Sequence, residues 1–282
     1  MKKIVFFNTK GGTGKTTLCY NYGWYLAEKR NKRILFLDFD PQVNLVQALQ
    51  KKLFPRSGHN LENLIVNYIK KNDINFSDYI VKINDKIDLI PSTNNISLVE
   101  EYLTDYLIKK AYTDNKEYQA LDRNLLIKEI LDNYINQEGY DYIIIDSQPN
   151  YSLLSTTSLV YAENVVLVLR PEYFSFIDIN YLNKIIKNLE DKFGVKINIA
   201  CVIINAFEKR KRTTEKIAER FVNRYGDRFH IIKQKIRFLS CYQLSISMDK
   251  NPVFVSFPNS EASKDLLKAF READEVIDNL HN

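Results

Sequence analysis

The 282-residue sequence has few of the residues that hold metal clusters or form disulfides. It contains only three cysteines and three histidines, scattered along the chain, and no CxxC pair. An odd and dispersed set of cysteines favours buried thiols in a reducing compartment. The spacing provides no set of ligands for zinc or for an iron–sulfur cluster.

Long apolar runs and domain linkers are also missing. Runs such as Val165–Leu169 are far shorter than the roughly 20 residues that cross a bilayer. The apolar residues after Lys3 lead directly into a glycine turn, so we do not expect a signal peptide. Because no stretch rich in Gly, Ser or Pro divides the chain, we expect one cytoplasmic domain over residues 1–282 that does not contact membranes.

Positive charge is concentrated in one part of the sequence. The whole chain carries 40 basic and 35 acidic residues, a net charge of +5. Between Lys209 and Arg237 there are eleven basic and three acidic residues. That stretch therefore carries +8 and the rest of the chain −3, so the excess positive charge is local.

Apolar runs that end in polar or proline-containing turns alternate with helical stretches along the chain. The runs that we expect to be strands are residues 3–8, 33–38, 87–92, 141–146, 164–170 and 196–205. This alternation predicts an α/β fold with a doubly wound, mostly parallel sheet, helices on both faces and a ligand site at the strands' carboxyl ends. Residues 51–138 are mainly helical by pattern, and we expect them to be a helical insertion that decorates the same domain.

Glycine is scarce, yet three of the eight glycines lie in one turn directly after the first strand. A strand, a glycine-rich turn and a Lys-Thr pair that opens a helix form a phosphate-binding loop, in which backbone N–H groups converge on phosphate oxygens. Lys15 would contact the β- and γ-phosphates of ATP, Thr16 would bind Mg²⁺, and Thr17 would lie against the α-phosphate. The nucleotide-binding residues predicted here are Lys10, Gly11, Gly12, Thr13, Gly14, Lys15, Thr16 and Thr17.

The loop departs from the general pattern at its first position, where Thr9 replaces a glycine and Lys10 follows. It resembles the deviant Walker A box, K-G-G-x-G-K-[ST], of the ParA/MinD superfamily, P-loop NTPases of the SIMIBI class. The resemblance implies a homodimer around ATP in which Lys10 reaches the partner subunit's phosphates. Such a lysine would act as an arginine finger does, by neutralising charge on the transferring phosphoryl group.

Two carboxylate segments extend the resemblance. Residues 35–42 are similar to the family's L-x-D-x-D-P-Q segment, which implies that Asp40 polarises the attacking water and that Asp38 helps to hold the magnesium shell. Residues 143–146 resemble a Walker B strand, so Asp146 would meet Mg²⁺, through water. The family usually continues with two prolines, but here Ser147 and Gln148 precede a single proline.

Further segments resemble the family over most of the chain. Residues 170–176, 89–92, 236–237 and 251–253 are similar to its recurrent turns, and residues 262–280 to its closing helix. The strand that ends at Asn205 is where relatives place a polar side chain that reads adenine, and an amide suits the Watson–Crick edge of that base.

The resemblance is closer to ParA than to MinD. MinD relatives end in a basic amphipathic helix that lies on the membrane, whereas residues 271–278 here are rich in acids that anionic lipid would repel. The chain begins directly at its first strand, so we expect the short ParA form without an N-terminal helix-turn-helix.

The basic stretch predicts a DNA surface. We expect a helix capped by Thr213 or Thr214 that ends near Tyr225 with Gly226, and with Ile217 and Phe221 facing the core. Basic side chains one helical turn apart on another face suit phosphate backbones, and no base-reading motif is present, so binding would be independent of sequence. The candidate DNA contacts are Lys209, Arg210, Lys216, Arg220, Arg224 and Arg237; a solvated basic face with no partner is the alternative.

These features predict a weak, magnesium-dependent ParA-type ATPase. By resemblance it would dimerise around ATP, bind DNA non-specifically, associate with the nucleoid in that state, and segregate or position a plasmid or chromosomal cargo. A ParB-like centromere-binding or adaptor protein would stimulate hydrolysis. The alternative is a ParA/MinD-like positioning or regulatory ATPase that acts on a protein cargo without DNA partition.

Overall fold

A computed structural model describes the chain apart from residues 50–57, 115–116, 118–121, 137, 174 and 281–282. In the described residues, seven strands form one sheet in the order β3-β4-β2-β5-β1-β6-β7. The strands are β1 (Lys2–Phe7), β2 (Ile34–Asp38), β3 (Val81–Lys82), β4 (Ile87–Ile90), β5 (Tyr142–Asp146), β6 (Asn164–Leu169) and β7 (Asn198–Ile204). All neighbours pair in parallel except β3, which pairs with β4 in the antiparallel direction. The predicted doubly wound, mostly parallel α/β fold is therefore confirmed.

The central strands are buried along their whole length because helices cover both faces of the sheet. Every residue of β2, β5 and β6 is buried, which explains why these strands read as continuous apolar runs without alternation. Side chains at alternate positions enter two separate cores: Val5 and Ile145 lie in one, Ile4 and Ile144 in the other.

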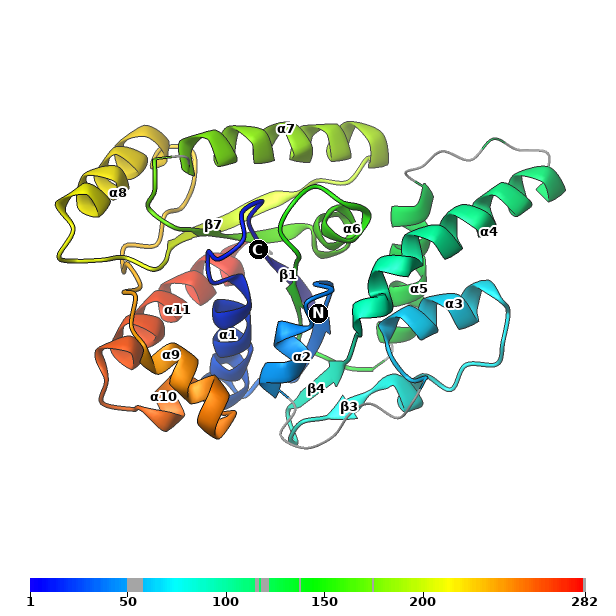
Figure 1. The fold of residues 1–282 in the computed structure, drawn as a ribbon, viewed down its shortest axis with the longest axis horizontal. Coiled ribbons are helices and arrows are strands. Elements are labelled where there is room, and N and C mark those ends of the chain that lie inside the picture. The colour runs from blue at the N-terminus through cyan, green and yellow to red at the C-terminus, as the bar shows by residue number, and fades with distance from the viewer. Residues whose placement is uncertain (50–57, 115–116, 118–121, 137, 174, 281–282) are drawn as a thin grey trace.

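Each core is closed by its own set of helices, which lie on opposite sides of the sheet (Figure 1). On one face are α3 (Leu61–Ile69), α4 (Val99–Asp114), α5 (Asp122–Ile135), α6 (Leu153–Ala162), α7 (Ser175–Phe193) and α8 (Arg212–Tyr225). On the other are α1 (Lys15–Arg30), α2 (Asn44–Leu49), α9 (Cys241–Leu244), α10 (Val253–Ser256) and α11 (Glu261–Asn279). Among the described residues, no helix combines the length and the hydrophobicity that a membrane span requires.

The stretch from residue 51 to 138 is mainly helical, as its pattern predicts, but it also contributes two strands to the sheet. Besides α3, α4 and α5 it contains the short helices η1 (Phe76–Tyr79) and η2 (Asn94–Leu98). The strand expected at 87–92 is β4, which pairs with β2. The edge strand β3 was not predicted, because two residues are too few to show an alternating pattern. Residues 51–57 lie outside the described part.

The order of the strands places the functional motifs at one edge. From β1 the chain passes to β2 on one side, and later strands place β5 and β6 on the two sides of β1. The loops after β1, β2 and β5 therefore meet at the carboxyl ends of adjacent parallel strands, where α/β sheets bind their ligands.

Candidate functional site

The turn between β1 and α1 has the backbone of a phosphate-binding loop. Gly12 and Gly14 adopt φ values of 71° and 90°, in the left-handed region that favours glycine. A Cβ atom on Gly14 would lie 2.2 Å from the amide nitrogen of Asn205, so no larger residue fits there. Helix α1 begins at Lys15, and its first N–H groups have no partner within the helix. The turn therefore offers N–H donors at the positive end of a helix, a setting that attracts phosphate.

The side chain of Lys15 is fixed in this turn by burial and by a hydrogen bond. Its side chain is buried, and Nζ donates a hydrogen bond to the carbonyl oxygen of Lys10 at 3.2 Å. Burial lowers the pKa of Lys15, while the negative charges of Asp146 and Asp40 act in the opposite direction. Lys10 is half-buried, and its backbone N–H donates to Asn8 Oδ1 at 2.9 Å. A lysine buried beside acids is suited to a polyanionic ligand that also carries a cation.

Thr16 and Asp146 form the part of the site that suits a metal ion. The Thr16 hydroxyl donates to Asp146 Oδ2 at 2.5 Å. The other carboxylate oxygen of Asp146, Oδ1, is buried and finds no hydrogen-bond partner among the described residues. Burial is the main cause that raises the pKa of Asp146, to about 7. A hydroxyl beside a buried carboxylate with an unused oxygen fits Mg²⁺, which prefers a few oxygen ligands and retained waters.

The two carboxylates after β2 have different surroundings. Asp38 is fully buried, and its oxygens accept the backbone N–H groups of Asp40 at 3.0 Å and Val46 at 3.2 Å. Burial and the nearby charge of Asp146 raise the pKa of Asp38. Asp40 accepts the Gln42 N–H at 3.0 Å and borders an open cavity. Asp38 therefore lies behind the site and fixes the loop that presents Asp40.

The cavity that Asp40 borders has a volume of about 580 Å³ and lies over the phosphate loop. The sequence-predicted residues that line it are Gly11, Gly12, Gly14, Lys15, Thr16, Thr17 and Asp40. The structure thus brings together residues from the β1 and β2 loops, with Pro149 of the β5 loop completing the wall. The loss of the family's second proline leaves this wall in place.

A second cavity, of about 360 Å³, lies on the other side of the same loop. Gly12, Gly14 and Thr17 border both cavities, so the loop separates them. Asn205 borders the second, and its amide donates to the Thr13 carbonyl oxygen at 2.7 Å. A base could therefore occupy this side while the phosphates lie on the other.

Two basic residues lie beside these cavities although the sequence did not predict either position. Lys250 lines the phosphate cavity, where its Nζ donates to the Gln47 carbonyl oxygen at 2.7 Å. It follows the π-helical turn η3 (Ser245–Asp249), and no local motif marks it. Arg237, predicted as a DNA contact, instead borders the second cavity, beside Asn205. Its guanidinium is held there by Asp265 at 2.7 Å and by Glu261 at 2.8 Å.

The basic stretch does form an exposed surface, with small corrections to its helix. Helix α8 begins at Arg212 after Lys211, so the predicted Thr213 or Thr214 cap is wrong; Thr214 is buried instead. Its buried stripe also includes Ala218, Phe221 and Tyr225, while Ile217 is only half-buried. Gly226 ends the helix as predicted. The exposed candidates are Lys209, Arg210, Lys216, Arg220 and Arg224.

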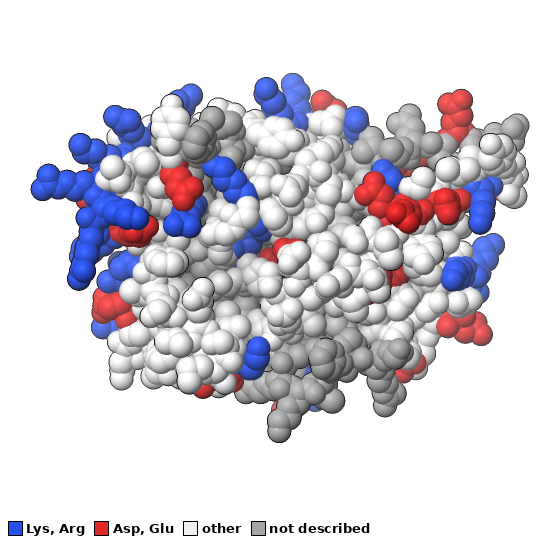
Figure 2. All heavy atoms as spheres, in the orientation of Figure 1, with Lys and Arg blue, Asp and Glu red and all other residues white. Residues whose placement is uncertain are grey.

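Figure 2 shows Lys and Arg side chains gathered at the end of the molecule where Figure 1 places α8. The centre of the same face carries few charges. On this face the basic side chains are therefore concentrated at one end, as the local charge of the sequence predicts.

Comparison with known proteins identifies the family to which this chain belongs. The family model described as an AAA domain matches residues 1–199, well over half of the chain. The chain belongs to this family. This match, together with relatives named as ParA family and chromosome-partitioning ATPases, places the chain in the ParA/MinD superfamily, so the resemblance of the phosphate loop is confirmed.

Individual relatives of this AAA-domain protein cover it almost end to end. An uncharacterized protein of Methanocaldococcus jannaschii is 32% identical over 99% of this chain and 100% of its own length. The virulence plasmid ParA family protein pGP5-D of Chlamydia psittaci is 27% identical over 98% of this chain and 96% of its own. Among solved structures, Cyanothece McdA in complex with ATP matches with a TM-score of 0.78 and 22% identity, covering 99% of this chain and 96% of that one. The fold is thus shared along the whole chain.

Proposed function

We propose that this protein is a ParA-type ATPase that binds and hydrolyses Mg-ATP, dimerises in the ATP state, and segregates or positions a plasmid or chromosomal cargo on DNA. The observation that carries the proposal is the grouping of Lys15, Thr16 and Asp40 around one cavity, with Asp146 hydrogen-bonded to Thr16. The Chlamydia relative is a ParA family protein of a virulence plasmid, which supports a plasmid as the class of cargo. Residues 1–282 would act as one domain, with 51–138 as its decoration.

Binding of the nucleotide follows from the two cavities. The N–H groups of the turn and the Lys15 ammonium would hold the phosphates, and Asn205 would face the base on the other side of the loop. Thr16 and Asp146 would hold Mg²⁺, with Asp38 supporting them from behind the sheet edge. When bound, Mg²⁺ would neutralise phosphate charge and orient the oxygens.

Hydrolysis needs an oriented water and charge compensation. Asp40 borders the phosphate cavity and keeps one carboxylate oxygen beyond the one that accepts the Gln42 N–H, so it can position and polarise a water. Lys10 lies immediately before the cavity-lining glycines, at the position from which a lysine would reach a partner subunit's phosphates. Such a site would be slow alone and faster when a ParB-like partner completes it.

The exposed cations of α8 and of the loop before it would bind DNA in the dimer. They contact phosphates without reading bases, so binding would be sequence-independent and the ATP-bound form would associate with the nucleoid. Arg237 is omitted from this surface because two carboxylates hold it. If DNA does not bind, the alternative is a positioning ATPase for a protein cargo.

Lys15→Ala tests the nucleotide assignment. The change removes the buried cation of the phosphate cavity, so we expect ATP affinity to fall by at least about a hundredfold, the value of a charge-assisted contact in a confined site. Equilibrium titration with labelled ATP and Mg²⁺ measures it, with Lys29→Ala, an exposed lysine of the same helix, as the control. Unchanged affinity in Lys15→Ala would remove the phosphate-loop assignment.

A further inference from the structure

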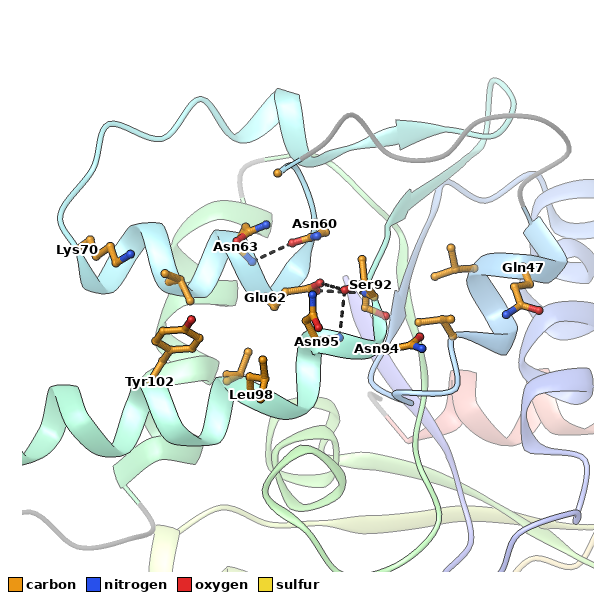
Figure 3. Close-up of a pocket in the computed structure, with 16 residues that line it drawn as sticks. Gln47, Asn60, Glu62, Asn63, Lys70, Ser92, Asn94, Asn95, Leu98 and Tyr102 are labelled. Carbon is orange, nitrogen blue, oxygen red and sulfur yellow. Dashed lines mark hydrogen bonds between the residues drawn. The ribbon is translucent and has the colours of Figure 1, made fainter.

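A third cavity, of about 660 Å³, lies away from the phosphate loop (Figure 3). It opens between α3 on one side and η2 with the start of α4 on the other, and α2 closes one end. The cavity has the size of a small-ligand or short-peptide site. Nothing in the proposed ATPase cycle uses it.

Side-chain amides dominate the polar lining of this cavity. Asn60 and Asn63 come from the start of α3, and Asn94 and Asn95 come from η2, where Asn95 points toward Glu62 (Figure 3). Gln47 of α2 lies at the closed end. Asn60 Oδ1 caps α3 by accepting the Asn63 N–H at 3.0 Å, which leaves the NH₂ group of Asn60 as a donor. A side-chain amide carries both donors and an acceptor, so this lining suits the N–H and C=O groups of an extended peptide.

Glu62 supplies a negative charge inside the cavity. Its residue is only 6% exposed, and its carboxylate accepts the Thr93 hydroxyl and, at 3.3 Å, the Thr93 N–H. No cation pairs with it among the residues that the structure describes, and Lys70 lies at the far end of α3 (Figure 3). Burial disfavours the charged form of this carboxyl and raises the pKa of Glu62. A cationic group from a ligand would offset that cost.

Ser92 is a second unsatisfied group in the wall. It is 3% exposed, and its hydroxyl has no hydrogen-bond partner within the described part of the chain. Ser92 precedes Thr93, so it lies beside the residue that holds Glu62. Buried polar groups are normally paired, and one left unpaired next to a buried carboxylate indicates a place for a polar ligand.

The rim favours a basic ligand with an aliphatic stem. Leu98 and Tyr102 line the cavity and remain 42% and 49% exposed, a surface on which the methylene groups of a lysine or arginine can pack. Glu101 and Asp105 are also exposed on α4, near the rim but outside the cavity lining. These charges complement a basic partner.

We propose that this cavity binds a short segment of a partner protein, with an arginine or lysine side chain paired to Glu62 and the flanking peptide groups bonded to the amides. Arginine suits the site best, since a guanidinium can reach Glu62 and Ser92 together with several donors.

Helix α2 connects this cavity to the phosphate cavity. Gln47 borders both, and the N–H of Val46, which lines the third cavity, holds Asp38 at 3.2 Å. Asp38 in turn fixes the backbone of Asp40. A segment bound here would shift α2 and with it the loop of Asp40, so the site would regulate hydrolysis; this consequence rests on the proposed function.

The binding proposal is tested without nucleotide, so that its failure and that of the ATPase assignment can be told apart. The probe is N-acetyl-arginine N-methylamide, added at millimolar concentrations to ¹⁵N-labelled protein, with the neutral citrulline analogue as its match. We expect saturable shifts at the amides of Asn60, Ser92 and Asn95, and about tenfold weaker binding of the citrulline analogue.

Variants locate the probe. Glu62→Gln keeps the size of the side chain and should weaken binding by about tenfold or more, while Glu28→Gln, an exposed acid of α1, should not change it. Ser92→Ala, a smaller change, should weaken binding by a few fold. It replaces Glu62→Gln as the test variant if Glu62→Gln lowers the melting temperature of the protein. Equal responses to the two probes, no saturable shifts, or full binding by both cavity variants would overturn the proposal.

Discussion

Asp38 and Asp40 are two residues apart but have different roles, because Asp38 points into the protein and Asp40 points into a cavity. Both oxygens of Asp38 accept backbone N–H groups, whereas Asp40 uses one oxygen to hold its own turn and faces the phosphate loop. Loss of Asp38 would therefore disturb the whole loop. Loss of Asp40 would remove a carboxylate from the cavity and leave its walls intact.

Asp40→Ala should bind ATP as the wild type does and hydrolyse it at least about a hundredfold more slowly, the usual share of a general base. The phosphate loop and Lys15 lie on other elements, so the residues that would bind the phosphates stay in place. Phosphate release under saturating Mg-ATP measures the rate, and labelled-ATP titration measures the affinity. Wild-type hydrolysis by the variant would take Asp40 out of the mechanism.

At the residue scale, the site residues that the sequence predicts are those that lie close together in one short segment. Gly12, Gly14, Lys15 and Thr16 are neighbours in the chain, so their spacing alone predicts their geometry. Lys250 reaches the same cavity from 235 positions beyond Lys15, through a π-helical turn that no pattern marks. Its place depends on how α2 and η3 pack.

Helix α8 is the element whose function can be tested most cleanly, because its two faces are distinct. Ala218, Phe221 and Tyr225 are buried in the core, while Arg220 and Arg224 are exposed one turn apart. No shift or packing change in the phosphate cavities is expected when the exposed face is altered.

Arg220→Ala/Arg224→Ala should weaken DNA binding equally for unrelated sequences and flatten its salt dependence. Each lost phosphate contact lowers the slope of log K against log salt by about 0.9. Gel-shift titrations at several salt concentrations, with ATP and with ADP, measure this. Lys29→Ala/Lys109→Ala removes the same charge from exposed positions on other helices and should bind DNA normally. Unaltered binding by the α8 variant would make the helix a solvated face only.

At the element scale, the long buried strands were predictable and the short or exposed pieces were not. β2, β5 and β6 are covered on both faces, so their apolar runs are unbroken. β3 pairs only at the sheet edge over two residues, and the start of α8 has no side-chain cap to mark it. Such boundaries follow from tertiary packing, which a local pattern does not contain.

For the whole molecule, the order of the strands is what assembles the site. Predicting an α/β sheet required only alternation, but the third cavity needed α2, α3 and α4 in their observed places. The sequence similarity to the Methanocaldococcus relative covers nearly the whole chain, and the McdA structure shares the fold over the same length. The charge concentrated at α8 lies at one end of that architecture (Figure 2).

If the chain works as proposed, Mg-ATP should switch it between one and two copies, and its mass in solution is the most direct measurement of that switch. Light scattering on the protein with Mg-ADP should give the mass of a single 33.1 kDa chain. With Mg-ATP and the slow Asp40→Ala variant it should give twice that mass, and Lys10→Ala added to this variant should return it to one chain. A mass that stays at one chain in saturating Mg-ATP, or that is doubled equally by ADP, would contradict the account.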